Sequence, residues 1–214
     1  MYKKPILFFL ILALTYTLNA QEKKKGILNI KKVGFLYNNV NAKNFVFEDK
    51  DYKYSSNILK LQAFYDLGKW KSFDIELIVQ PEIQVIKHQL LNEQFVLPSE
   101  NNYQDLRLEF TTPKTMHLYA FELGFALKRE IIKNLDFKAT IGLGLATIDT
   151  RTERLAKGFT FIENGSLGFS YKTTKKTSLY LGSNIGHVSN FDTKTPNNGY
   201  SFLGLEIGVY YLLK

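Results

Sequence analysis

Apolar and polar residues alternate along most of the chain after residue 26, with the period of two that is typical of a β-strand whose two faces meet different surroundings. The clearest example runs from Phe73 to Val85, where every odd-numbered position is apolar and every even-numbered position except Ile78 is polar. The same alternation covers residues 117–128 and 135–146. Helical spacing is nearly absent, so the pattern predicts an all-β protein.

The alternating segments are long and their connections differ in length. Segments of about ten residues or more can cross a bilayer at a tilt, and long loops at one end with short turns at the other are typical of a transmembrane β-barrel. We therefore predict an eight-stranded antiparallel transmembrane β-barrel with both termini on the periplasmic side. Strands are expected at 28–38, 55–67, 72–86, 116–129, 134–147, 158–171, 177–190 and 201–213. The long connections are 38–54, 87–115, 148–157 and 191–200, and the tight ones are 68–71, 130–133 and 172–176.

The composition of the two faces favours a membrane barrel over a soluble one. A lipocalin-like barrel places its apolar face inside around a hydrophobic ligand, whereas a small membrane barrel turns that face to lipid and fills its narrow interior with polar and small residues. Here the polar face is rich in Gly, Ala, Thr, Gln and Glu. Aromatic residues near the short turns and the C-terminus are expected to form a periplasmic girdle. They are Tyr65, Trp70, Phe73, Phe169, Tyr171, Tyr210 and Tyr211.

The N-terminal 20 residues have the order of a secretory signal peptide. Lys3 and Lys4 precede a short apolar run, and a polar segment begins after Ala20. The alternative, an N-terminal membrane anchor, is disfavoured because the apolar run is short for a bilayer-spanning helix. We expect residues 1–20 to be a cleaved signal peptide and residues 21–214 to be the barrel, located in the outer membrane of a Gram-negative bacterium.

Composition narrows the chemistry. Hydrophobic residues make up 45% of the chain, the formal net charge is +8, and cysteine is absent. The absence of cysteine excludes disulfides, thiolate metal sites and a cysteine nucleophile, so any catalysis must use oxygen or imidazole. We find no metal-ligand spacing, phosphate-binding loop or nucleic-acid module, and the basic charge does not indicate a nucleic-acid partner.

One histidine has a nucleophile at a suitable spacing. His187 and Ser189 are two residues apart on a predicted strand, so both point to the same face, where imidazole can accept a hydroxyl proton. That face also carries Leu179, Leu181 and Ile185 and is assigned to lipid, near the outer-leaflet interface. Ionisable groups on a lipid face are costly and indicate function. The alternative interpretation is that His187 and Ser189 are two polar residues near the end of a strand without a catalytic role. The other two histidines, His88 and His117, have no nucleophile beside them in the sequence.

The C-terminal motifs resemble those of a known family. His187-Val188-Ser189-Asn190, followed by Pro196-Asn197-Asn198-Gly199 and a final strand, is similar to the His-x-Ser-Asn and Pro-Asn-x-Gly motifs of the outer-membrane lipid A deacylases, the PagL-type acyloxyacyl hydrolases. The resemblance implies hydrolysis of an acyl ester of lipid A in lipopolysaccharide, without metal or organic cofactor. It further implies that Ser189 is the nucleophile, that His187 is the general base, and that Asn190 and Asn197 help to form the oxyanion hole.

The sequence departs from the family at the acid that orients the histidine. That glutamate lies two residues after the glycine of the second motif, and the position here is Ser201. Glu206 is on the same strand, but its parity places it inside the barrel. Asp192 would reach the histidine only if the outer loop folds over.

Hairpin register suggests another acid. If the turn between residues 171 and 177 centres on Thr174, Glu163 points outward and lies diagonally next to His187, within reach of a long side chain. A bulge at Asn164-Gly165 would instead turn Glu163 inward. A third possibility is that Ser201 orients the histidine as a neutral acceptor, which leaves a weaker triad or an inactive chain. The expected function is thus a Ser/His deacylase with Glu163 as acid, and the alternative is a catalytically silent barrel with a structural or adhesive role.

Overall fold

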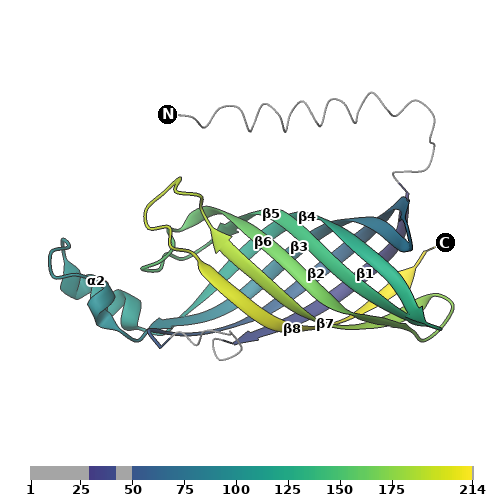
Figure 1. Ribbon diagram of the computed structural model, residues 1–214. Coiled ribbons are helices and arrows are strands. Elements are labelled where there is room, and N and C mark those ends of the chain that lie inside the picture. The colour runs from purple at the N-terminus through teal and green to yellow at the C-terminus, as the bar shows by residue number, and fades with distance from the viewer. Residues whose placement is uncertain (1–28, 42–49, 214) are drawn as a thin grey trace, which may run out of the picture.

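The computed structural model describes residues 29–41 and 50–213 (Figure 1). The expected signal peptide, residues 1–20, lies outside the described residues. Neither helix in the described part of the chain is long and apolar enough to cross a membrane.

Eight antiparallel strands form a closed barrel in chain order. The first strand closes on the last, with Lys32 to Val40 paired to Leu212 to Gly204. Eight strands at the predicted places confirm the predicted fold class. The strands are β1 (Ile30–Asn41), β2 (Tyr52–Trp70), β3 (Phe73–Leu90), β4 (Lys114–Ile132), β5 (Leu135–Ile148), β6 (Gly158–Lys172), β7 (Thr177–Ser189) and β8 (Tyr200–Leu212).

Several strands are longer than the alternation predicts. β2 and β4 each have 19 residues, which at about 3.3 Å per residue is roughly twice the thickness of a bilayer's hydrocarbon core. The added residues lie at the two ends, where strands continue to pair outside the lipid. There the backbone ladder persists although lipid no longer requires apolar residues at alternating positions.

The connection between β3 and β4 contains helical structure that the sequence pattern did not predict. A short 3-10 helix, η2, spans Glu93–Phe95, and an α-helix, α2, spans Tyr103–Thr111 and projects from one end of the barrel (Figure 1). Phe110 of α2 is buried in an apolar cluster with Tyr52, Leu90 and Val96. A small apolar cluster, separate from those of the barrel interior, therefore anchors the helix to the ends of β2 and β3.

The outer and inner faces of the barrel have the predicted polarity. Leu123 on β4 is 54% exposed, and other apolar side chains are exposed around the outer surface. Glu122, the residue before Leu123, is buried inside. In the interior, Lys60 Nζ lies 3.1 Å from Glu206 Oε1 and 3.6 Å from Glu82 Oε2. Charged groups buried in this way are stable only when paired.

A hydrogen-bonded layer fills the rest of the mid-barrel interior. Gln80 Nε2 donates to Glu122 Oε1 at 3.1 Å, and Asn164 Nδ2 donates to Glu122 Oε2 at 2.8 Å. Only about 30 Å³ of space remains in this layer. Side chains therefore fill the interior of the barrel about halfway along its axis.

The predicted aromatic girdle is wrong in one member. Tyr210 faces inward, where it is buried against Phe64 and Tyr180 and accepts a hydrogen bond from Lys138 Nζ at 2.9 Å. Tyr211, the next residue, is exposed on the outer surface. Consecutive residues of a strand face opposite sides, so Tyr210 and Tyr211 could not both lie on the outer face.

Candidate active site

Three outward-facing polar side chains lie in one row across adjacent strands. Glu163 of β6 is directly opposite His187 of β7, and His187 is directly opposite Ser201 of β8. The side chains around the row on the same face include the exposed apolar Leu143 and Ile185, with Ser189 two residues beyond His187. The row is therefore a polar interruption in the apolar outer surface.

The β6–β7 register differs by two residues from the one expected. Glu163 pairs with His187 itself instead of with Ile185, because the hairpin centres one residue later than Thr174. The ladder through Asn164 and Gly165 is continuous on both sides, so no bulge turns Glu163 inward. Glu163 is exposed on the outer face, closer to the histidine than the sequence suggested.

Ser201 is the hydrogen-bond partner of the histidine. The distance between His187 Nδ1 and Ser201 Oγ is 2.8 Å. Among the described residues, no hydrogen bond or ion pair joins Glu163 to His187. When Nδ1 carries the proton and donates it to Ser201, Nε2 is left as the acceptor nitrogen. The position at which the resemblance places an acid thus holds a neutral hydroxyl, which contacts Nδ1 of His187.

The candidate nucleophile, Ser189, ends β7 on the same face as His187. It is half-buried and pairs across the sheet with Phe161. Phe161 stacks edge-on against Phe159 and against Phe191, with ring centroids 4.8 and 4.5 Å apart. Phe191 has a φ of 49°, which is unfavourable for a bulky residue. An aromatic wall thus lies beside Ser189, and the sequence motifs gave no indication of it.

The two asparagines of the motifs are joined by the loop after β7. Asn190 N–H donates to Asn197 Oδ1 at 2.6 Å, and Asn197 Nδ2 donates to Asp192 Oδ1 at 3.0 Å. The side chain of Asn190 is buried and donates to Lys194 O at 2.6 Å, so it shapes the loop. Asp192 therefore orients Asn197, and it makes no described contact with His187.

The preceding outer loop braces this arrangement. Asn198 N–H donates to Arg154 O at 2.7 Å, and Ala156 N–H donates to Pro196 O at 3.0 Å. Leu155 forms an isolated bridge with Asn197. These contacts join segments about 40 residues apart in sequence, and no local signal predicts them.

Gly199 sits directly against the histidine. Its φ is +62°, and an added Cβ would lie 2.2 Å from Val188 O and 3.0 Å from His187 Nε2. Only glycine satisfies both the backbone conformation and the close approach. The glycine of the second motif therefore leaves space at the nitrogen that would receive a proton.

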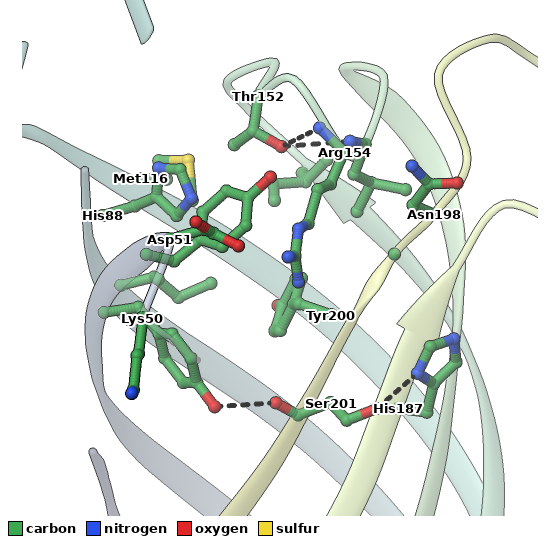
Figure 2. Close-up of a pocket in the computed structure, with 16 residues that line it drawn as sticks. Lys50, Asp51, His88, Met116, Thr152, Arg154, His187, Asn198, Tyr200 and Ser201 are labelled. Carbon is green, nitrogen blue, oxygen red and sulfur yellow. Dashed lines mark hydrogen bonds between the residues drawn. The ribbon is translucent and has the colours of Figure 1, made fainter. Parts of the chain in front are cut away.

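Two hollows meet at this row. On the outer surface, a shallow groove of about 370 Å³ is lined by Glu163, Gly165, Ile185, His187 and Ser201, among others. At the mouth of the barrel, a cavity of about 490 Å³ also includes His187 and Ser201 in its wall (Figure 2).

The other candidate acids and histidines do not join the row. Glu206 is buried inside and paired with Lys60, as its parity predicted. His88 Nε2 is 3.6 Å from Glu153 Oε1 at the mouth. His117 Nδ1 is 2.9 Å from Asp149 Oδ2 on the rim, and Asp149 Oδ1 accepts a hydrogen bond from Thr150 Oγ1 at 2.8 Å.

Comparison with known proteins agrees with the fold and the motifs. The crystal structure of the outer membrane enzyme PagL superposes with a TM-score of 0.53 at 13% identity, covering 83% of this chain and 97% of that one. The structure of Neisserial surface protein A (NspA) gives a TM-score of 0.46 at 13% identity, covering 85% and 96%. No curated protein sequence matches the chain. The family model described as lipid A 3-O-deacylase (PagL) matches residues 93–210. Because this match spans more than half of the 214 residues, the chain belongs to the lipid A 3-O-deacylase (PagL) family of outer-membrane β-barrels.

Proposed function

We propose that the protein hydrolyses a fatty acyl ester of lipid A in the outer leaflet, with Ser189 as nucleophile and His187 as general base. The observation that carries the proposal is the hydrogen bond between His187 Nδ1 and Ser201 Oγ on the lipid-facing surface. His187 lies two residues before Ser189 on the same strand. A fixed imidazole beside a serine on this face has lipid as its nearest substrate. Family membership supports lipid A as that lipid.

The proposed reaction has two acyl-transfer steps. His187 Nε2 takes the proton of Ser189 Oγ as Oγ attacks the ester carbonyl carbon, and the imidazolium then gives the proton to the departing sugar oxygen. The acyl group remains on Ser189 as an ester. Water then attacks the same carbonyl carbon while His187 accepts its proton; the bond to Oγ breaks, Oγ regains a proton, and the fatty acid leaves.

Glu163 and Ser201 have different proposed roles. Ser201 fixes the tautomer and direction of the ring through Nδ1. Glu163, directly opposite on β6, stabilises the imidazolium by its negative charge. A carboxylate opposite the histidine and a hydroxyl at the ring nitrogen together replace the single glutamate of the family motif.

Asn190 and Asn197 are proposed to form the oxyanion hole. The N–H of Asn190, directly after the nucleophile, donates to Asn197 Oδ1 and so positions the amide of Asn197. The side-chain Nδ2 of Asn197 carries two hydrogens, of which Asp192 accepts one. Asn197 therefore retains a donor for the oxygen on which negative charge develops. Asp192 holds that donor in place and contacts no reacting atom.

The outer groove is proposed to take the acyl chain. It runs past His187 and contains Gly165, an outward-facing residue without a side chain between Ile141 and Ile185. An added Cβ at Gly165 would meet only ordinary contacts, at 3.7 Å or more. The missing side chain thus leaves a depression in an otherwise apolar lipid-facing surface.

We further propose that residues 1–20 direct export and are removed, and that the barrel functions in the outer membrane of a Gram-negative bacterium. The lysines before the apolar run and the polar residues after Ala20 support this route. Mass analysis of the barrel purified from outer membranes would locate its N-terminus.

The proposed activity is tested by expression in a Gram-negative host and mass spectrometry of extracted lipid A. The wild type should remove one acyl chain, Ser189→Ala should remove none, and the matched control Ser183→Ala, on the outer face of the same strand, should behave as wild type. Folded wild type that leaves every lipid A species intact would favour the catalytically silent barrel, which the serine at the acid position also fits.

A further inference from the structure

Hydrolysis on a lipid-facing surface needs a source of water. The outer side of His187 is bordered by apolar residues such as Ile185 and Leu143, which exclude water where the barrel meets lipid. The second step of the proposed function nevertheless consumes one water molecule at this histidine. A supply from the other side of the barrel wall would resolve the conflict.

The cavity at the barrel mouth lies on that other side. It has a volume of about 490 Å³, enough for on the order of ten water molecules at ~30 Å³ each. Figure 2 shows Arg154 and Tyr200 in its middle, with Met116 and His88 on one side and Asn198 and His187 on the other. The cavity therefore reaches from the far wall of the barrel to the candidate general base.

The wall between the cavity and the lipid side is thin at the site. His187 and Ser201 line both the cavity and the outer groove. Gly199 also lines the cavity and places no side chain over His187 Nε2. His187 and Ser201 therefore form part of the wall between the two hollows.

The cavity has polar groups that water would satisfy. His88 Nδ1 is buried and has no hydrogen-bond partner among the described residues. Arg154, Asn198 and Tyr200 add donors and acceptors to the wall. Buried polar atoms without protein partners are usually bonded to ordered water, whereas dry cavities are apolar.

A packed polar layer separates the cavity from the periplasmic end of the barrel. The layer around Lys60, Gln80 and Glu122 leaves only about 30 Å³ of space. The cavity lies above this layer, beside Thr152, Arg154 and Asn198 of the outer loops. Water that enters the cavity would therefore come from the extracellular side.

We propose that the water that releases the fatty acid from Ser189 comes from inside the barrel, through the mouth cavity and past Gly199. In this step His187 accepts a proton from cavity water, the water oxygen bonds to the acyl carbonyl carbon, and the bond to Ser189 Oγ breaks with return of the proton to Oγ. This inference rests on the proposed function. It assigns the cavity to the second step and the outer groove to the first.

Single cysteines test the route, because the chain has no cysteine of its own. Met116→Cys places a thiol in the cavity wall, and the full-length barrel in lipid vesicles is treated with a charged, water-soluble methanethiosulfonate. Intact-protein mass then measures both labelling and the acyl ester on Ser189 during turnover. Asp105→Cys, on the exposed side of α2, is the labelled control, and Ile86→Cys is a second cavity position should Met116→Cys not fold.

We expect the cavity cysteine to be labelled and the labelled protein to accumulate acyl-Ser189, with release of the fatty acid slowed at least tenfold and release of the first product changed less than threefold. Labelled Asp105→Cys should match the wild type. An unlabelled cavity cysteine, or labelling that leaves both steps unchanged or slows them equally, would overturn the inference. Absence of any acyl ester on Ser189, with activity retained in Ser189→Ala, would instead overturn the proposed function.

Discussion

Replacing Glu163 with glutamine removes a negative charge opposite His187 while preserving the size of the side chain. Directly opposed residues of an antiparallel pair have Cβ atoms about 5 Å apart, so we take roughly 5 Å as the distance between the carboxylate and the imidazolium. At an effective dielectric constant of about 20, two unit charges at this distance interact by about 3 kcal/mol. Since about 1.4 kcal/mol corresponds to a tenfold change, Glu163→Gln should lower kcat roughly 10²-fold.

The assay measures the initial rate of fatty acid release from lipopolysaccharide in detergent micelles, with folding checked by heat-dependent electrophoretic mobility. Glu206→Gln is the matched control, because Glu206 is a buried interior carboxylate that contacts no proposed catalytic group. Folded Glu206→Gln should retain the wild-type rate. Adding Ser201→Glu to Glu163→Gln should restore activity, because it places a carboxylate at the partner of His187 Nδ1.

The reasoning is refuted if folded Glu163→Gln keeps a rate within threefold of the wild type while Ser201→Ala loses most activity. Ser201 alone would then orient the imidazole of His187. A tenfold to hundredfold loss for Ser201→Ala alone is expected in either case, because a hydrogen bond to a group that becomes charged contributes about 1.5–3 kcal/mol.

Three further substitutions probe other parts of the molecule. Asn197→Ala should lower kcat by 10²–10³-fold with little change in KM, measured by the same rate assay, because an oxyanion donor acts mainly in the transition state; a change in KM alone would remove it from the oxyanion hole. Gly165→Leu should fill the outer groove and shift the preference toward shorter acyl esters in a competition assay, and an unchanged preference would place the chain elsewhere. Lys60→Met should leave the buried carboxylates of Glu82 and Glu206 without their cation and destabilise the barrel by about 3–5 kcal/mol, read from urea unfolding in detergent; unchanged unfolding would contradict the pairing.

The barrel was predictable because lipid imposes a strict rule on alternating positions. From Phe73 to Val85 the side that meets lipid must be apolar at every second residue, so parity and strand number follow from the sequence. Outside the lipid, alternating positions need not be apolar. The alternation therefore did not predict the extra length of β2 and β4. The nine residues of α2 are held by burial of Phe110 against distant strands, which local spacing does not reveal.

The site was predictable in its components but not in its spacing. His187 and Ser189 follow from strand parity, and the outward direction of Glu163 follows from the same rule. The direct pairing of Glu163 with His187 depends on where the hairpin turns, and a shift of one residue in the turn centre moves the pairing by two. The hydrogen bond to Ser201 depends on the β7–β8 register, which the long loop between those strands leaves open.

Closure of the barrel between its first and last strands has a consequence for assembly. β8 carries Ser201 and lies between β7 and β1, so it is fixed on both edges only when the two ends of the chain have met. An unclosed sheet would leave unpaired backbone groups of β1 and β8 in lipid, which is strongly unfavourable. The strand that carries the partner of the histidine is thus held on its second edge only by the event that seals the barrel. Ester hydrolysis would then report completed insertion, and a chain stalled before closure would be silent even with every catalytic residue present.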